Sequence, residues 1–238
     1  MNNRNHILII TGGVQQPEFL QECCEKETFD YVIAVDGALE LIDRLSIPIH
    51  CLVGDFDTVS LDILKKYERK ENLYVEQHIP EKDETDTELA LRIAMEKNAA
   101  DITIVGATGG RLDHFLGNLH ILLQPLRRNI PCSLLDPWNR IRLVQEYCVF
   151  SEENAFGTYI SFLPFTDEVQ DVSLTGFKYP LNHACLKKGN TLGVSNERIA
   201  SKAEVRLGKG ILICVESQDM GSKEKGKAAH LQSCAEMR

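Results

Sequence analysis

The chain has 238 residues, a net charge of −9 and 43% hydrophobic residues. That length allows two modest domains with packed cores. The acidic balance argues against nucleic acid as the main partner, because such binding depends on Lys and Arg neutralising phosphates. The apolar run Ile7 to Ile10 is too short for a signal-peptide core, and no stretch approaches the length of a membrane span. We therefore expect a soluble, cytoplasmic protein.

The first 135 residues alternate short apolar runs with helical patterns, which is typical of a parallel sheet covered on both faces. Each apolar run ends near Gly or Asp. This pattern predicts a Rossmann-like α/β domain over residues 1–136 with about six parallel strands. The expected strands are His6 to Ile10, Tyr31 to Val35, Leu52 to Val53, Leu73 to Ile79, Ile102 to Val105 and Cys132 to Leu135.

Five helices are expected between these strands. The fourth has the clearest start, because Thr85 and Glu88 have the spacing of a capping box. Its apolar residues then recur at i, i+4, which places a stripe against the sheet. The expected helices are Glu18 to Glu27, Gly37 to Arg44, Leu61 to Arg69, Asp86 to Asn98 and Asp113 to Leu126.

The pattern changes after Pro137, where strand-like runs follow one another without long helical periodicity. Short strands separated by turn residues predict a small all-β domain, a sandwich or barrel, over residues 137–218. Gly208-Lys209-Gly210 has the composition of a hairpin turn, and residues 219–238 read as a flexible tail. The expected strands are Ile141 to Val144, Thr158 to Phe162, Glu168 to Leu174, Ala203 to Leu207 and Ile211 to Val215.

The eight cysteines include no C-x-x-C pair. Cys51, Cys132 and Cys214 lie inside apolar runs, where a free thiol packs as a small hydrophobic side chain. We expect buried thiols and no zinc.

Acidic clusters follow three of the expected strands. Asp55 and Asp57 follow the third strand, Asp83 and Asp86 the fourth, and Asp113 the fifth. Open α/β sheets bind ligands at the carboxyl ends of their strands, and Mg²⁺ is held by a few carboxylates together with phosphate oxygens. Asp also favours turns and helix N-caps, but that explanation leaves five acids repelling one another. The pattern predicts a Mg²⁺-polyphosphate site at these carboxylates.

The chain has neither a P-loop nor a G-x-G-x-x-G motif. Two glycine turns, Thr11-Gly12-Gly13 and Gly106 to Arg111, are the alternatives for presenting backbone N–H groups to phosphate. The second contains Gly109 and Gly110 and ends in Arg111, whose forked guanidinium suits phosphate oxygens. His114 either binds a phosphate or caps its helix.

The all-β region has one polar stretch of interest, Gly193 to Glu197, which is either a turn or part of a binding cleft. We expect Trp138 and Tyr179 to be packing residues.

Four motifs stand out in the chain: Gly54 to Thr58, Asp83 to Asp86, Gly109 to His114 and Gly193 to Glu197. Together, in this order and near these spacings, they closely resemble those of bacterial thiamine pyrophosphokinases over about residues 6 to 219. The resemblance implies a homodimer with an ATP-binding α/β domain, a thiamine-binding β-sandwich, and active sites where the subunits meet. It implies that Asp55, Asp57, Asp83, Asp86 and Asp113 carry Mg²⁺ and phosphates, that Thr85 and Arg111 support the phosphates, and that Ser195 with Asn196 contacts thiamine.

One departure concerns the thiamine ring. Animal members of the family stack a late Trp on thiamine, whereas the comparable stretch, Gly210 to Val215, contains none.

The expected reaction is Mg²⁺-dependent transfer of diphosphate from ATP to the hydroxyl of thiamine, with AMP released and with Asp83 or Asp113 as proton acceptor. Two rivals remain open. Asp55-x-Asp57-x-Val59 fits the D-x-D-x-[TV] pattern of haloacid-dehalogenase-like phosphatases, in which the first Asp is the nucleophile. The other rival is a non-enzymatic nucleotide or thiamine sensor.

Overall fold

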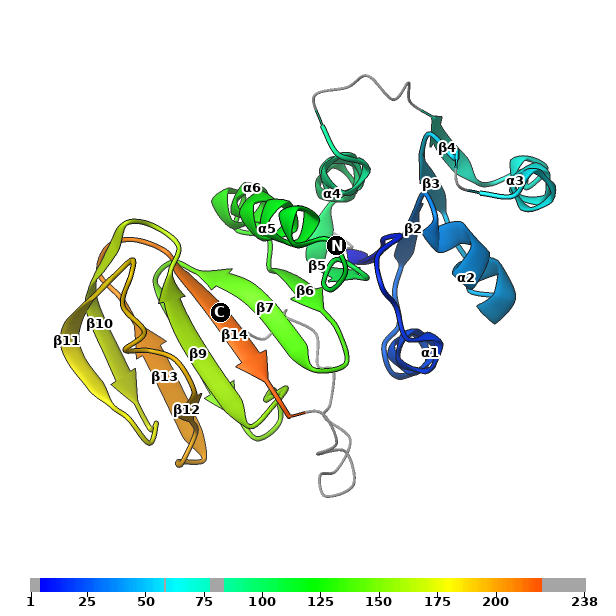
Figure 1. Ribbon diagram of the computed structural model, residues 1–238. Coiled ribbons are helices and arrows are strands. Elements are labelled where there is room, and N and C mark those ends of the chain that lie inside the picture. The colour runs from blue at the N-terminus through cyan, green and yellow to red at the C-terminus, as the bar shows by residue number, and fades with distance from the viewer. Residues whose placement is uncertain (1–4, 58, 78–83, 220–238) are drawn as a thin grey trace. The chain divides into compact units, whose positions relative to one another are not determined.

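The computed structural model describes residues 5–57, 59–77 and 84–219. Contacts divide the chain into two units, Met1–Pro137 and Trp138–Arg238, here called the α/β unit and the sandwich unit (Figure 1). Asp83, Thr58 and residues 220–238 of the expected tail lie outside the described residues.

The strands of the α/β unit form a parallel sheet in the order β6-β5-β1-β2-β3-β4. The apolar runs of the central strands are buried, as expected of a sheet covered on both faces. The expected parallel sheet is confirmed. Its strands are β1 (Asn5–Ile10), β2 (Tyr31–Val35), β3 (Cys51–Gly54), β4 (Tyr74–Gln77), β5 (Ala99–Val105) and β6 (Cys132–Leu135).

Helices cover both faces of this sheet. From β1 to β4 each new strand is added at the same edge of the sheet, and the chain then returns to place β5 on the other side of β1. Because such crossovers are right-handed, helices that connect strands in opposite directions along the sheet lie on opposite faces. Figure 1 shows α1 and α2 on one side, and α4 and α5 on the other. Helix α4 contacts β1, β2, β3 and β5. The helices are α1 (Pro17–Lys26), α2 (Ala38–Leu45), α3 (Leu61–Glu68), α4 (Asp86–Glu96), α5 (Leu112–Ile121) and α6 (Leu123–Arg127).

The continuous helix expected from Asp113 to Leu126 is wrong. Helix α5 ends at Ile121, and α6 begins at Leu123. Pro125 explains the break, because proline has no N–H to donate to the carbonyl of Ile121 and its ring crowds that carbonyl.

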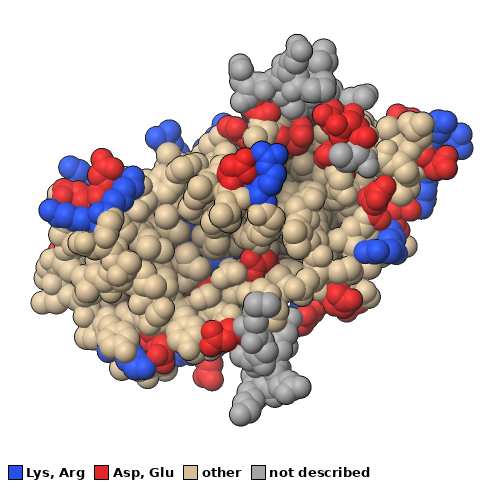
Figure 2. Space-filling model, in the orientation of Figure 1, with Lys and Arg blue, Asp and Glu red and all other residues tan. Residues whose placement is uncertain are grey.

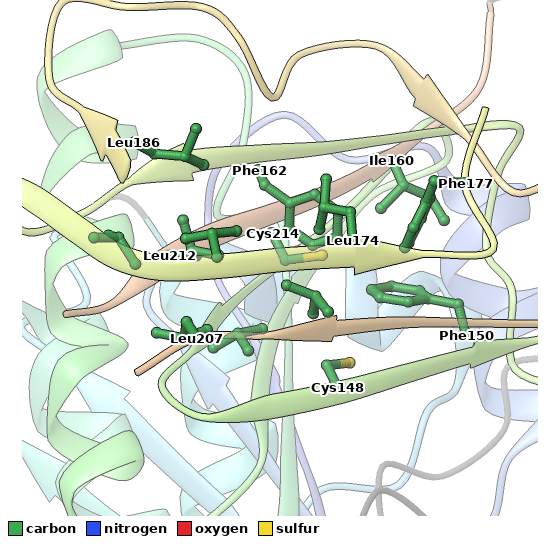
Figure 3. Packing of buried hydrophobic residues seen from close by; sticks show 14 of the residues in the cluster. Cys148, Phe150, Ile160, Phe162, Leu174, Phe177, Leu186, Leu207, Leu212 and Cys214 are labelled. Atoms are coloured by element: carbon green, nitrogen blue, oxygen red, sulfur yellow. The ribbon is translucent and has the colours of Figure 1, made fainter. Parts of the chain in front are cut away.

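The sandwich unit is built from two antiparallel sheets, ordered β12-β9-β14-β7 and β11-β10-β13-β8. Side chains from both sheets form one core, in which the rings of Phe150, Phe162 and Phe177 meet edge to face with centroids 5.6 to 5.9 Å apart (Figure 3). The strands are β7 (Asn139–Val144), β8 (Tyr147–Ser151), β9 (Tyr159–Pro164), β10 (Glu168–Thr175), β11 (Leu181–Lys187), β12 (Asn196–Glu197), β13 (Lys202–Arg206) and β14 (Leu212–Ser217).

The hairpin expected at Gly208-Lys209-Gly210 is wrong. The strands on either side of it belong to different sheets, because β13 pairs with β8 and β10 whereas β14 pairs with β7 and β9. The segment crosses from one layer of the sandwich to the other, and Lys209 forms an isolated bridge with Gln170 on the way.

A charged group lies buried inside the sandwich unit. Glu216 is fully buried, and its carboxylate accepts from Arg140 at 3.0 and 2.8 Å and lies 3.0 Å from Arg142. The backbone N–H of Phe156 also donates to it at 3.2 Å. The two guanidinium groups and the main-chain donor therefore compensate a charge that burial alone would strongly disfavour.

Cys51 and Cys214 are buried free thiols, as expected, and Cys132 is partly exposed. Among the described residues, no helix is long and apolar enough to span a membrane.

Candidate active site

The strand order of the α/β unit reverses between β1 and β5. In open α/β sheets, ligands bind outside the carboxyl ends of the strands at such a reversal. Here the turn Thr11-Gly12-Gly13 follows β1, and the turn from Gly106 to Gly110 follows β5. The two glycine turns therefore flank the position that the topology favours for a ligand.

These two turns approach each other so closely that side chains are excluded. A Cβ built on Gly13 would lie 2.1 Å from the carbonyl oxygen of Gly106. One built on Gly106, which has a φ of +80°, would lie 2.6 Å from the carbonyl oxygen of Thr11. Gly109 and Gly110 also have positive φ. Backbone thus lines much of this part of the edge, beside the side chains of Val14 and Gln15, and backbone without a Cβ can approach a ligand closely.

Three carboxylates meet beside the turns. Asp36, Asp55 and Asp57 each offer an oxygen, and these oxygens lie within 4.8 Å of one another. Asp36 follows β2, whereas Asp55 and Asp57 follow β3, the neighbouring strand. Figure 2 shows acidic side chains gathered over the α/β unit. The structure thus brings two of the expected metal ligands together and adds a third.

The backbone around this group adopts uncommon conformations. Gly54 has a φ of +151°, and a Cβ on it would lie 3.1 Å from the Cβ of Asp36. Asp36 and Phe56 both have positive φ, 42° and 62°. Such a conformation is a genuine outlier for a bulky residue, and Phe56 is held in it with only 5% of its surface exposed. Strained residues of this kind cluster at functional sites.

The carboxylate group fits a hard divalent cation. Mg²⁺ takes oxygen ligands at about 2.0 to 2.1 Å in octahedral geometry, so opposite ligands lie about 4.2 Å apart. Adjacent ligands lie about 2.9 Å apart in the same geometry, so the three oxygens, which lie within 4.8 Å of one another, would reach it by moving closer together around one ion. The three carboxylates could therefore hold a divalent cation such as Mg²⁺.

Asp36 is the residue that sequence reasoning missed. Its signal was the pair Asp36-Gly37 at the end of the run Tyr31 to Val35, the same strand-to-helix position that singled out Asp55. Only the strand order shows that β2 lies directly beside β3.

Asp113 and Arg111 form a bidentate pair. The Nε and Nη2 atoms of Arg111 donate to the Asp113 carboxylate at 3.1 and 2.6 Å, and the backbone N–H of His114 donates to it at 3.0 Å. The hydrogen bond from Arg111 lowers the pKa of Asp113 to about 2 and raises that of Arg111. Both side chains are largely exposed, and exposed ion pairs exchange easily for other partners.

Asp113 does not lie at a junction next to Asp55. Strand β5, which precedes Asp113, is separated from β3 by β1 and β2. Three strand spacings amount to about 14 Å. Among the described residues, the close carboxylate group is Asp36, Asp55 and Asp57 alone, so metal binding by Asp86 and Asp113 stays a prediction.

Thr85 caps helix α4, as the sequence predicts. Its Oγ1 accepts from the backbone N–H of Glu88 at 3.2 Å. Asp86 lies in the first turn of the same helix, where a negative charge is favourable. If Thr85 also supports phosphates, as we expect, its hydroxyl must contact the phosphate while it caps the helix.

The polar stretch of the sandwich unit is a turn that presents Ser195. Ser195 is exposed and has a φ of 56°. Only 2% of the surface of Asn196 is exposed. Its side-chain oxygen accepts a hydrogen bond from the backbone N–H of Tyr179 at 3.0 Å, and its side-chain nitrogen donates to the backbone carbonyl of Tyr179 at 2.8 Å. The Asn196 oxygen also accepts from Glu197 N at 2.9 Å. Asn196 thus ties the segment of Tyr179 to the turn of Ser195.

Tyr179 is not the packing residue that we expected, because 56% of its surface is exposed. Asn196 holds both the N–H and the carbonyl of Tyr179, so its ring is presented from a fixed backbone.

Comparison with known proteins identifies both units. The family description "Thiamin pyrophosphokinase, catalytic domain" matches residues 24–134, and "Thiamin pyrophosphokinase, vitamin B1 binding domain" matches residues 146–212. A thiamine pyrophosphokinase of Bacillus subtilis is 42% identical over 191 residues, which cover 79% of this chain and 87% of the relative.

Solved structures agree. The crystal structure of the Bacillus subtilis thiamine pyrophosphokinase matches with a TM-score of 0.80 and 34% identity, over 90% of this chain and 100% of that one. That of a Geobacillus thermodenitrificans thiamin pyrophosphokinase matches with a TM-score of 0.78 and 31% identity, over 91% and 99%. The chain belongs to the thiamine pyrophosphokinase family of enzymes.

Proposed function

We propose that this enzyme transfers a diphosphate group from ATP to the primary hydroxyl of thiamine, giving thiamine diphosphate and AMP. The observation that carries the proposal is the group of Asp36, Asp55 and Asp57 at the carboxyl edge of the sheet. It lies within residues 24–134, which match the catalytic domain of the family. A polyphosphate with its cation is the ligand that suits such a group.

Asp36, Asp55 and Asp57 would hold Mg²⁺, and Asp83, Asp86 and Asp113 remain candidates for a shared or second cation. The bound ion would supply neutralisation of the negative charge on the transferring phosphates. The chain's own contribution is to fix the carboxylates, which Gly54 and the buried Phe56 do from the backbone side.

The phosphates would lie along the glycine turns. Gly109 and Gly110 leave the backbone accessible, and Arg111 supplies a forked cation for phosphate oxygens. Asp113 accepts from Nε and Nη2 of Arg111, so a phosphate would either displace Asp113 from these atoms or bind the remaining N–H donors of the guanidinium. His114 follows directly, and its contact with phosphate stays a prediction.

The chemical step is an in-line displacement. The thiamine hydroxyl oxygen bonds to the β-phosphorus while the bond from that phosphorus to the α–β bridging oxygen breaks, and AMP leaves with the bridging oxygen. The hydroxyl proton passes to a carboxylate, for which Asp83 and Asp113 are the candidates. Catalysis of this kind rests on positioning and on charge stabilisation. No covalent enzyme intermediate is needed.

Thiamine would bind at the turn of Ser195 in the sandwich unit. Ser195 is exposed and available for a hydrogen bond. The ring of Tyr179 is exposed, and the Lys178 ammonium lies over it, 5.6 Å from its centroid. A cationic heterocycle would displace Lys178 or use the opposite face of the ring. Tyr179 would thereby take the place of the late Trp that animal members of the family stack on thiamine. Direct contact of Asn196 with thiamine stays a prediction, and its three hydrogen bonds within the unit favour a supporting role.

We also propose that the enzyme is a homodimer. Helix α5 exposes Leu112 and Leu116, at 73% and 52%, on one face at i, i+4 spacing. Exposed apolar side chains in such an arrangement suit a protein interface. Light scattering of the purified protein should give twice the chain mass, and the mass of one chain would contradict the proposal.

The two rival functions are not favoured by the family match. A phosphatase that uses Asp55 as nucleophile would require neither thiamine nor the sandwich unit. The matched family is one of enzymes, which does not favour a sensor without catalysis.

Product analysis tests the proposal. The protein is incubated with ATP, Mg²⁺ and thiamine, and the nucleotides are separated after quenching. We expect AMP and thiamine diphosphate in one-to-one yield and an absolute dependence on a divalent cation. Stoichiometric ADP would contradict diphosphate transfer, and inorganic phosphate with a labelled Asp55 would support the phosphatase instead.

A further inference from the structure

The turn that presents Ser195 begins where a strand ladder stops. Strand β12 pairs with β9 through Asn196 with Ile160 and Glu197 with Tyr159. The next pair in this antiparallel register would be Ser195 with Ser161. Ser195 cannot continue the ladder, because its φ of 56° lies outside the extended region.

A side chain replaces the missing ladder bond. The backbone N–H of Ser195 donates to the Oγ of Ser161 at 3.0 Å. Ser161 belongs to β9 and is only 8% exposed. Its neighbours Ile160 and Phe162 point into the sandwich core (Figure 3), so the alternation of a strand turns Ser161 to the other face of the sheet.

The other end of the turn is anchored on the same strand. Phe162 N donates to Gly193 O at 2.8 Å, and a Cβ on Gly193 would lie 2.3 Å from Phe162 O. Between these two anchors the chain has little freedom. The hydroxyl of Ser161 is the anchor next to Ser195 itself.

We propose that Ser161 is a positioning residue for thiamine, acting by holding Ser195 in its left-handed conformation. This inference rests on the proposed thiamine contact of Ser195. Without the acceptor, the N–H of Ser195 must find water, and the left-handed conformation, which is uncommon for a residue other than glycine, loses its support. The Ser195 side chain then leaves the orientation that meets the ligand.

The same unit contains a matched control. Ser173 lies on β10, and its Oγ accepts from the backbone N–H of His183 at 3.1 Å. His183 also has a positive φ, 50°. Ser161→Ala and Ser173→Ala therefore remove the same kind of hydrogen bond, and only the first lies at the turn of Ser195.

The test compares KM values for thiamine and ATP, together with kcat and the melting temperature. For Ser161→Ala we expect the KM for thiamine to rise on the order of 10-fold, while kcat and the KM for ATP change less than about twofold. Ser161→Thr, which keeps the hydroxyl, should restore the KM. Ser173→Ala should lower the melting temperature by less, because Ser173 is less buried than Ser161, and should leave every kinetic constant unchanged.

Two results would overturn the inference, and they are distinguishable. If Ser161→Ala keeps a normal KM for thiamine while Ser195→Ala raises it, Ser195 contacts thiamine but Ser161 does not position it. If neither variant changes the KM, the thiamine contact of Ser195 is itself wrong. Should Ser161→Ala fail to fold, Ser161→Cys supplies the same comparison, because sulfur is a weak acceptor of similar size.

Discussion

Two regions of the molecule gather charges in opposite ways. In the sandwich unit, Arg140 and Arg142 surround the buried carboxylate of Glu216 within 2.8 to 3.0 Å. In the α/β unit, Asp36, Asp55 and Asp57 bring three like charges together at the edge of a sheet.

The difference separates a structural group from a ligand site. A buried charge is tolerated only where partners replace its hydration, and the sandwich unit supplies those partners from its own strands. Like charges in contact destabilise the protein that carries them, and the strained backbone at Asp36 and Phe56 adds to that cost. The first group should therefore govern folding, and the second should govern activity.

The largest effect is expected from removing the buried carboxylate. Glu216→Ala leaves two guanidinium groups buried without their partner, which typically costs about 3 to 5 kcal/mol. We expect a fall of that size in the free energy of unfolding, measured by urea titration. Glu146→Ala removes an exposed carboxylate and serves as the control. Equal stability of the two variants would show that Glu216 is not a structural charge.

Acid should act on the same group. Burial acts to raise the pKa of Glu216, but Arg142 and Arg140 outweigh it, and the pKa lies below the usual 4.5. A lowered folded-state pKa adds stability above the unfolded-state value, and this stability is lost as the pH falls through the folded-state pKa. As the pH is lowered, the free energy of unfolding of Glu216→Ala should therefore fall less steeply than that of the parent protein.

The next effect is expected at the acidic edge. Asp55→Asn should lower kcat by about 10² to 10³, or about 3 to 4 kcal/mol of transition-state stabilisation, by analogy with the loss of one preorganised catalytic group. The melting temperature of the metal-free protein should stay level or rise, because one like charge is gone. Asp62→Asn, at an exposed position of α3, is the matched control. Normal turnover by a folded Asp55→Asn variant would remove Asp55 from the site.

A smaller effect is expected at the thiamine turn. Asn196→Ala releases the segment of Tyr179 from the turn of Ser195 and leaves the backbone N–H and carbonyl of Tyr179 without their partner. Such a loss costs about 1 to 3 kcal/mol. Because the turn of Ser195 is the proposed thiamine contact, we expect the free energy of thiamine binding to weaken by that amount and ATP binding to stay unchanged. Calorimetry that shows unchanged thiamine affinity would make this turn structural only.

The smallest effect concerns the pair of Asp113 and Arg111. In the ligand-free protein, Asp113 should titrate near pH 2, as its pKa indicates, and Arg111→Gln should return it to the ordinary range. The pair stabilises the folded state above the unfolded-state pKa, and this contribution disappears as the pH falls towards 2. Carbon-detected NMR of the carboxyl group measures both values, and an unshifted pKa in the parent protein would contradict the pairing.

Much of the α/β unit could be predicted from the sequence, because continuous apolar runs and strand-end Gly or Asp are local signals. The bounds of β2 and β6 follow directly from the runs Tyr31 to Val35 and Cys132 to Leu135. The cap at Thr85 is equally local.

Features that depend on tertiary contacts could not be predicted from the sequence. Strand β11 is mostly exposed, so it shows no alternation of buried residues. Asp36 joined the site only because β2 and β3 are neighbours in the sheet. The sandwich layers could not be assigned from Gly208 to Gly210, since glycine permits a hairpin turn and a crossing between sheets equally well.

Manganese binding tests most directly whether the carboxylate group is a cation site. Mn²⁺ is titrated into the protein with α,β-methylene-ATP, whose α–β bond resists transfer, and bound ion is counted by electron paramagnetic resonance. The parent protein and Asp62→Asn should bind the ion with equal affinity, whereas Asp36→Asn should bind it at least about 10-fold more weakly, as expected on losing one charged ligand. Equal affinity in all three proteins would contradict the assignment of Asp36, Asp55 and Asp57 as the metal site.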